Sequence, residues 1–291
     1  MQTTIAEVHT TSYTPVRRAI LRIFHFKSAF IGLVIVLFYT VVALFAQNLS
    51  PYSPIDQHPK DRLQAPSAAY VLGTDEFGRD ILSRIIFGAQ NSLRISVFSV
   101  AVACLIGTIL GMVAGYTGGL YDNIIMRVMD LLFAFPSILL ALFIVTALGT
   151  GARNTIMAIS IVYTPIFARV ARAPVLVIKT EEFVLAARAL GAGHLRTLVR
   201  HILPNIFAPI LVQISLALSW VMLTEASLSF LGLGTVPPNP SWGSMLSDSR
   251  RLMELAPWTA VFPGLAIMLG VLGFSLLGDG LRDMLNPRLR K

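Results

Sequence analysis

Charged side chains are scarce in this chain of 291 residues, since Asp, Glu, Lys and Arg make up 13% and hydrophobic residues 55%. A soluble domain of ordinary composition carries about 25% charged residues, so the shortage argues against a water-soluble fold. Cysteine is scarcer still: Cys104 is the only one, and no internal disulfide can form. Its place inside an apolar run indicates a small buried packing residue.

Several motifs that would indicate chemistry are missing. The sequence has no Gly-x-x-x-x-Gly-Lys-Ser/Thr loop, which excludes ATP binding by that route. It also lacks Gly-x-Ser-x-Gly, His-Glu-x-x-His and Cys-x-x-Cys, so no membrane-embedded enzyme is indicated and no catalytic residue is assigned. The five histidines are His9, His25, His58, His194 and His201. They lack a paired ligand spacing, so we expect no metal site and no cofactor in this chain.

Long apolar runs are what the sequence does contain. A helix needs roughly 20 residues to cross a bilayer. The six candidate spans are 28–47, 91–115, 129–149, 155–177, 205–232 and 258–280. The first run follows basic residues, as a secretory signal would, but it is too long and lacks a persuasive cleavage site. The sequence therefore predicts an all-α, polytopic protein with six transmembrane helices in membrane lipid.

The positions of Lys and Arg predict the orientation, because cytoplasmic segments retain the excess of basic residues. With the N-terminus inside, fifteen of the 23 lie on the inner side and eight on the outer side, which predicts an N-in, C-in topology. Arg169 and Arg172 end the fourth run and are expected to snorkel to the inner interface. The basic residues form no stripe interleaved with exposed aromatics, so no nucleic-acid partner is expected.

The connecting and kinked segments give further expectations. Residues 48–68 are rich in proline and predict an irregular outer loop, whereas 75–90 alternate charged and apolar residues and predict a short amphipathic helix at the membrane surface. Pro136 and Pro165 predict kinks. Tryptophans near the ends of the apolar runs, Trp242 among them, are expected to anchor the chain at the membrane–water interface.

A stripe of glycines lies in the second run at a spacing of four. It consists of Gly107, Gly111 and Gly115, which align on one helical face and let another helix approach closely. Two interpretations stay open: static helix packing, or a helix seam that moves during transport.

The inner segment 178–204 carries the most information. Thr180 is a possible N-cap, and Glu181 and Glu182 complement the helix dipole. The apolar face predicted for the helix consists of Phe183, Ala186, Ala187 and Leu190. Gly191 suits a left-handed C-terminal cap, and a second helix is expected to end at Pro204. This pair of helices is either interfacial packing or a lever for a cytosolic partner.

The same residues point to a family. The sequence Ala186-Ala187, then Gly191, then Leu203-Pro204 resembles the loop with which membrane subunits of bacterial binding-protein-dependent ABC importers dock on an ATPase. Two positions differ: Leu185 replaces the glutamate of the motif, removing a carboxylate that could form a salt bridge, and His201 stands at the usual isoleucine.

The resemblance extends beyond this loop. The further matching segments are Leu72–Asp75, Gly78–Asp80, Ser227–Gly234, Pro237-Pro238, Trp242-Gly243 and Gly278–Asp283. They are similar to the second, C-type permease of the dipeptide, oligopeptide and nickel importers, in a bacterial cytoplasmic (inner) membrane. The resemblance implies a type I ABC importer fold, peptide import by alternating access, and a chain that crosses the membrane several times.

The resemblance also implies partners. They are a homologous second permease, two ATP-binding subunits that carry ATP and Mg, and an extracytoplasmic solute-binding protein. Import of nickel, metal chelates or glutathione is the alternative for the same machinery. A stand-alone secondary transporter is the alternative class.

Two expectations concern the organisation of the chain and its cargo. Residues 1–90 are expected to form a cytoplasmic tail, a first transmembrane helix and an extracytoplasmic segment, and 91–291 the transmembrane domain with its coupling loop. Glu225, late in the fifth run, either lines the substrate pathway or pairs with a neighbour at the outer interface. Asp279 is expected to cap a helix or pair with Arg282.

Overall fold

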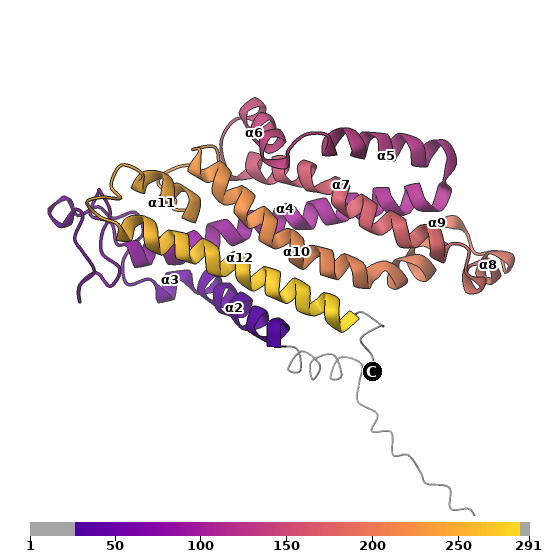
Figure 1. Cartoon of the computed structure of the whole chain (residues 1–291), viewed down its shortest axis with the longest axis horizontal. Helices are drawn as coiled ribbons and strands as arrows, with labels where there is room; N and C mark the ends of the chain where they lie inside the picture. The colour runs from indigo at the N-terminus through magenta and orange to yellow at the C-terminus, as the bar shows by residue number, and fades with distance from the viewer. Residues whose placement is uncertain (1–26, 286–291) are drawn as a thin grey trace, which may run out of the picture.

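The computed structural model describes residues 27–285, which form a bundle of long helices (Figure 1). Five helices are long and apolar enough to cross a membrane. They are α2 (Lys27–Leu44), α4 (Ile81–Thr117), α7 (Ala152–Ile178), the continuous helix His194–Phe230, and α12 (Trp258–Leu285). A sixth, bent span passes the same test as a pair of helices, α5 (Gly119–Phe133) and α6 (Ser137–Leu148). The all-α membrane fold predicted from the sequence is confirmed.

The third span, predicted over 129–149 with a kink at Pro136, is broken into two helices at that proline. The chain bends by 93° between α5 and α6. Pro136 has no N–H to donate and disfavours a helical conformation at Phe135, so α5 ends and a new helix begins after the proline. Figure 1 shows α5 running along α7, with α6 turned away from that direction. Pro165 does not break α7, which is continuous to Ile178.

The predicted surface helix over 75–90 is wrong, because α4 begins at Ile81 and continues unbroken for 37 residues. The Asp80 carboxylate caps this helix by accepting from the backbone N–H of Ser83 at 2.8 Å. Ile81 is 1% exposed and Arg84 is 3% exposed, so this part of the chain is buried in the bundle. The alternation of charged and apolar residues arises here from buried ion pairs, described below.

The helix boundary predicted at Pro204 is also wrong. The helix runs on through α9 (His194–Arg196), the π-helical turn η2 (Thr197–Ile202) and α10 (Leu203–Phe230). The Leu203 N–H bonds to the carbonyl of Leu198, five residues back. A π turn widens the helix just before the proline ring, which would otherwise clash with the carbonyl four residues earlier.

The bundle has two distinct ends. One end carries α8 (Glu182–Ala189), and both the start of α2 and the end of α12 point toward it (Figure 1). The opposite end carries three short helices and the loops between them. They are α3 (Ala46–Leu49), the 3-10 turn η1 (Pro59–Asp61) and α11 (Trp242–Ser249). The structure therefore separates a hairpin end from a loop end.

Trp242 belongs to the core and does not anchor an interface as predicted. Its side chain is 0% exposed, and its indole N–H donates to the carbonyl of Ile85 at 3.0 Å. Its ring meets Tyr39 edge to face, with centroids 5.3 Å apart. Because these three residues come from α11, α4 and α2, the tryptophan holds the loop end onto the spans.

Candidate functional site

The first candidate site is the segment from Lys179 to Leu203, which we call the α8 hairpin. It projects from the bundle between the end of α7 and the start of α10 (Figure 1). The predicted docking face is open to solvent: Phe183 is 46% exposed and Leu190 is 89% exposed. Ala186 is exposed as well, and Ala187 is half-buried. A contiguous exposed apolar patch outside the membrane spans is the kind of surface that a protein partner covers.

The hairpin turns at Gly191, as expected from the sequence. Gly191 has a φ of +87°, which a residue with a Cβ adopts only at a cost. Its N–H bonds to the carbonyl of Arg188 at 2.9 Å, and the N–H of Ala192 bonds to that of Ala187 at 3.0 Å. These two bonds form a Schellman cap. A Cβ at Gly191 would meet nothing within 4 Å, so space around the turn is free.

The predicted N-cap is wrong in detail. Thr180 donates its hydroxyl back to the carbonyl of Val177 at 2.8 Å and does not cap α8. Glu181 occupies the N-cap position without a side-chain bond, and Glu182 lies in the first turn. Both carboxylates are exposed beside the free amides of the helix start, where their negative charge is favourable.

Two contacts fix the ends of the hairpin to the end of α4. The Lys179 ammonium donates to the carbonyl of Gly115 at 2.7 Å. The Tyr116 hydroxyl lies 3.0 Å from Nδ1 of His194. Within the hairpin, Val184 of α8 is 0% exposed, and α8 packs against the η2 turn. A force applied to the hairpin therefore reaches the end of α4 through Lys179 and His194, and α7 and α10 through the chain.

The glycine stripe of α4 lies against α7. A Cβ at Gly107 would come within 2.5 Å of the carbonyl oxygen of Thr164, and one at Gly115 within 3.0 Å of that of Arg172. At Gly111 the same atom would collide with the carbonyl of Ala168. The two helices thus touch backbone to backbone over two helical turns, which only small residues allow.

Arg169 and Arg172 do not simply reach for the interface, because both pair with α5. The Arg172 guanidinium donates to both carboxylate oxygens of Asp122, each at 2.6 Å. Arg169 donates to Asp130 at 2.7 Å, and this pair is about half exposed. These ion pairs hold the first half of the bent span along α7.

The loop end carries a compact ionic cluster. Arg79 donates to the carboxylate of Asp75 at 2.6 Å, and Arg84 lies 3.5 Å from the same oxygen. Asp248 on α11 lies 3.8 Å from Arg79 and 3.6 Å from Arg84. Burial raises the pKa of the Asp248 carboxyl, while the two guanidinium groups oppose that shift. The cluster joins Asp75, Arg79 and Arg84 to α11, so these charges hold the loop end together.

Glu225 lies inside the subunit. Its side chain is 0% exposed, and Oε1 accepts from the Ser229 hydroxyl at 2.7 Å. Oε2 has no hydrogen-bond partner within residues 27–285. Glu225 thus bonds to a neighbour, as one alternative expected, but its full burial places it inside the subunit and not at an exposed interface; a role on the substrate pathway stays a prediction.

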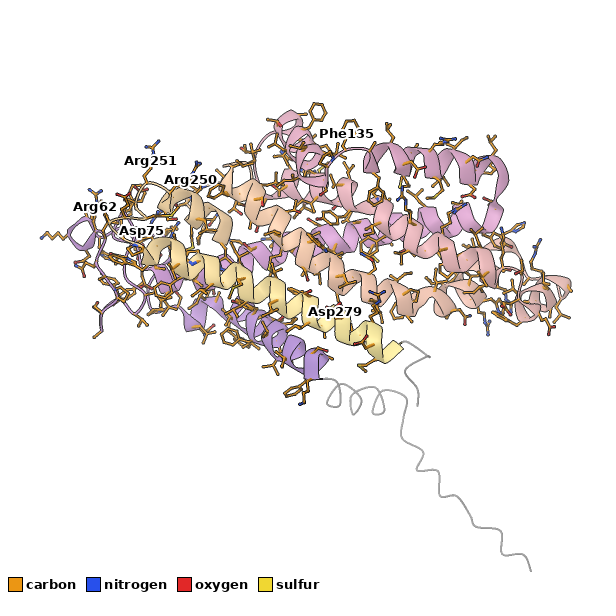
Figure 2. All side chains as sticks on the ribbon, in the orientation of Figure 1. Arg62, Asp75, Phe135, Arg250, Arg251 and Asp279 are labelled. Atoms are coloured by element: carbon orange, nitrogen blue, oxygen red, sulfur yellow. The ribbon has the colours of Figure 1, made fainter. Side chains whose placement is uncertain are left out.

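Asp279 is exposed on α12 and forms no ion pair with Arg282 in the described part of the chain (Figure 2). The two glycines that flank Asp279, Gly278 and Gly280, are required by close helix packing. A Cβ at Gly278 would lie 2.8 Å from Leu216 of α10, and one at Gly280 would collide with Ala29 of α2. The motif packs α12 between two helices.

The five or six candidate spans and the exposed helical hairpin at one end define a class: a polytopic membrane protein with a helical hairpin outside its apolar spans. The chain belongs to the family described as binding-protein-dependent transport system inner membrane component, whose profile matches residues 107–291. The N-terminal transmembrane domain of oligopeptide transport permease C matches residues 14–66. The chain is thus a multi-pass permease subunit of an ABC importer and not an enzyme.

Curated relatives are similar to this chain over most of its length. The dipeptide transport system permease protein DppC of Alkalihalophilus pseudofirmus is 47% identical over 280 residues, which cover 96% of this chain and 92% of the relative. The glutathione transport system permease protein GsiD of Pectobacterium atrosepticum is 48% identical, covering 88% and 85%. The di/tripeptide permease DppC of Pseudomonas aeruginosa is 44% identical, covering 91% and 90%.

Solved structures support the fold. The inward-facing MetNI methionine ABC transporter aligns with a TM-score of 0.58 at 16% identity, covering 71% of this chain and 98% of that chain. An amino acid ABC transporter with histidines aligns with a TM-score of 0.54, covering 70% and 95%. The type I importer fold inferred from the sequence is confirmed.

Proposed function

We propose that this chain is one of two homologous permease subunits that import short peptides. Two ATP-binding subunits, which hold ATP and Mg, drive the transport, and an extracytoplasmic solute-binding protein delivers the cargo. The proposed topology is N-in and C-in, with the α8 hairpin, the start of α2 and the end of α12 on the cytoplasmic side. The dipeptide and di/tripeptide permeases among its relatives support the choice of cargo.

The exposed face of the α8 hairpin is the observation that carries this proposal. Its small and apolar side chains, from Phe183 to Leu190, lie open on a short hairpin at one end of the bundle, beyond the long apolar helices whose exposed side chains suit lipid. The hairpin is the docking site for an ATP-binding subunit. Closure of the two ATP-binding subunits moves the hairpin, and its bonds to the end of α4 carry that motion into the spans.

The tight seam between α4 and α7 makes the motion a rigid-body one. Because backbone touches backbone along the glycine stripe, the two helices cannot slide without losing contacts on both sides. A push at the hairpin therefore tilts α4 and α7 together. Alternating access arises when this unit moves against its counterpart in the second permease.

Glutathione is the runner-up cargo, supported by the GsiD relative. It shares amide groups and free carboxylates with other short peptides, so the same pathway would serve both. Nickel is a weaker choice, because residues 27–285 contain no cluster of three or more His, Cys, Asp or Glu that could hold a metal ion. Uptake of labelled dipeptides, glutathione and nickel by cells with and without this chain separates the three.

Gly191→Trp and Ala187→Arg test the coupling role. Each places a large side chain on or beside the open face, and we expect ATP-dependent uptake to fall at least tenfold while membrane insertion is unchanged. Gly191→Asn is the matched control, since asparagine tolerates a positive φ and is much smaller. The control should keep most of the uptake. Normal uptake and substrate-stimulated hydrolysis in both bulky variants would remove the coupling role.

Glu225→Gln tests the proposed pathway role separately. If the buried carboxylate becomes accessible to cargo in another conformation, loss of its charge should change the uptake kinetics of some peptides and not others. Unchanged kinetics for every peptide tested would show that Glu225 has only a structural role.

A further inference from the structure

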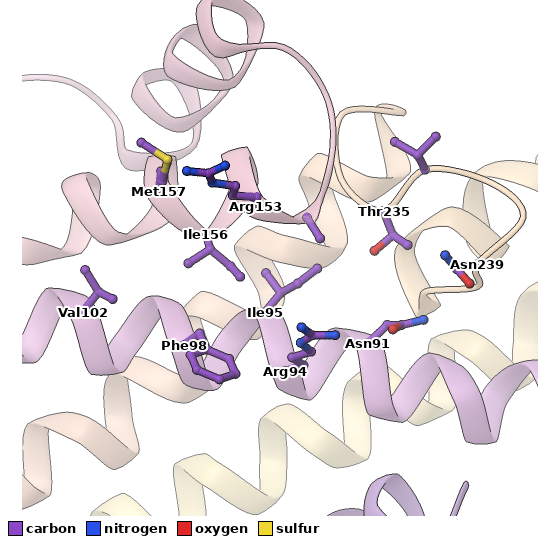
Figure 3. A pocket seen from close by; sticks show the side chains of 12 residues that line it. Asn91, Arg94, Ile95, Phe98, Val102, Arg153, Ile156, Met157, Thr235 and Asn239 are labelled. Atoms are coloured by element: carbon purple, nitrogen blue, oxygen red, sulfur yellow. The ribbon is translucent and has the colours of Figure 1, made fainter. Parts of the chain in front are cut away.

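A large hollow lies toward the loop end, between α4, the start of α7 and the segment that follows α10. Its volume is about 660 Å³, within the range of about 300–1,000 Å³ that is usual for small-molecule sites. Figure 3 shows side chains from these three parts of the chain around one space. None of these residues was assigned a role from the sequence.

The polar side chains of the hollow are two guanidinium groups, two amides and one hydroxyl. They are Asn91, Arg94, Arg153, Thr235 and Asn239. No acidic residue lines the hollow. Arg94 and Arg153 are both exposed, and neither forms an ion pair with any residue in 27–285. The other arginines near the loop end of α4, Arg79 and Arg84, are both neutralised by aspartates.

Unpaired arginines need an explanation at this place. Arg94 stands at the head of the long apolar part of α4, where charged residues face water, protein or a ligand because lipid is unfavourable. Two guanidinium groups with no carboxylate nearby give the hollow a positive potential, and low-dielectric walls strengthen it. Guanidinium groups match carboxylates through paired hydrogen bonds.

The remaining lining suits a peptide of variable sequence. Ile95, Phe98 and Val102 come from α4, and Ile156 and Met157 from α7. Such a surface accepts apolar side chains of different shapes, and Met157 in particular is flexible. The asparagine amides can donate to and accept from peptide groups.

From this arrangement we propose that the hollow is a cargo subsite that holds the carboxylate end of a peptide, with Arg94 and Arg153 as its anion-binding residues. The proposal rests on the proposed function, because it names the part of the cargo that this subunit contacts. The hollow supplies no acidic group for the peptide's amine. A group outside this lining must accept the amine, so the cargo lies with its carboxylate toward α4 and α7.

A cysteine placed in the hollow reports its charge without relying on uptake. Val236 lines the hollow and is 49% exposed, so we would introduce Val236→Cys together with Cys104→Ala in the intact complex. The probes are methanethiosulfonates of opposite charge, one a sulfonate and one a trimethylammonium. The ratio of their reaction rates measures the local potential. The complex without Val236→Cys gives the background.

We expect Arg94→Gln with Arg153→Gln to lower the ratio of sulfonate to trimethylammonium rates roughly tenfold. The matched control is Arg250→Gln with Arg251→Gln, which removes the same charge from exposed side chains outside the hollow (Figure 2). The control should leave the ratio nearly unchanged. Equal effects of the two double variants, or no effect of either, would overturn the assignment.

A second arm identifies the anion as cargo. With the binding protein and ATP present, a dipeptide with a free carboxylate should slow labelling of the cysteine more than the same dipeptide as a carboxamide. Equal protection by both would overturn the cargo assignment, and protection by neither would show that the arginines serve a different anion, such as a lipid headgroup. Failure of the proposed function would appear separately, as a lack of ATP-dependent peptide uptake by the unmodified complex.

Discussion

The contact between α4 and α7 gives the sharpest prediction about stability, because the same substitution should have opposite effects at two glycines. A Cβ at Gly107 would lie 2.5 Å from the carbonyl oxygen of Thr164 and 2.6 Å from the Cβ of Phe167. Ordinary contact needs about 3.4 Å or more, so the helices must separate by nearly 1 Å. At Gly264 of α12 a Cβ would meet nothing within 4 Å.

The magnitudes follow from these distances. Overpacking of this kind costs about 1–3 kcal/mol, and a clash with backbone belongs at the upper end because the backbone cannot rotate away. Alanine gains about 1 kcal/mol over glycine inside a helix. We therefore expect Gly107→Ala to lower the free energy of unfolding by about 2 kcal/mol, and Gly264→Ala to raise it by up to about 1 kcal/mol.

Titration of the detergent-solubilised complex with sodium dodecyl sulfate, followed by near-ultraviolet circular dichroism, would measure both changes. The sign at each position is the decisive result. If Gly107→Ala were as stable as Gly264→Ala, the backbone contact between α4 and α7 would be absent in the membrane. The rigid-unit mechanism proposed for these helices would then lose its basis.

The other predictions concern side chains that tie elements together. Asp122→Asn should lower the free energy of unfolding by about 2 kcal/mol, because it leaves the partly buried Arg172 unpaired. Asp130→Asn frees the exposed Arg169 and should cost under about 1 kcal/mol. Equal losses for the two variants in the same titration would contradict this ranking. Trp242→Phe removes a buried hydrogen bond and should cost about 2 kcal/mol, and retention of full stability would show that α11 is held by other contacts.

The number and approximate position of the spans could be predicted from the sequence, because an apolar run long enough to cross lipid is a strong signal. The two runs at 155–177 and 258–280 became α7 and α12 with small changes at their ends. The prediction was less successful where tertiary contacts decide. The sequence gives no measure of how far the chain bends at Pro136, since that depends on whether neighbours absorb the break.

The charge pattern over 75–90 led to a wrong prediction for the same reason, because tertiary contacts decide its structure. The alternation over 75–90 has the period of a surface helix, yet its arginines are buried because Asp75 and Asp248 neutralise them. Asp248 is far away in sequence, so no local pattern announces the pairing. The exposed hairpin was predicted correctly as a small-faced helix with a glycine cap, since both signals are local. The hollow near Arg94 and Arg153 was missed because its lining comes from three separated segments.

The docking of the α8 hairpin on an ATP-binding subunit is the central claim, and a photo-cross-linking amino acid at Leu190 tests it most directly. Leu190 is 89% exposed on the open face, so its replacement should not disturb the fold. In the intact complex, illumination should join this position to the ATP-hydrolysing subunit. Cross-linking to lipid or the binding protein alone, or labelling of this position by an impermeant reagent from outside the cell, would contradict the account.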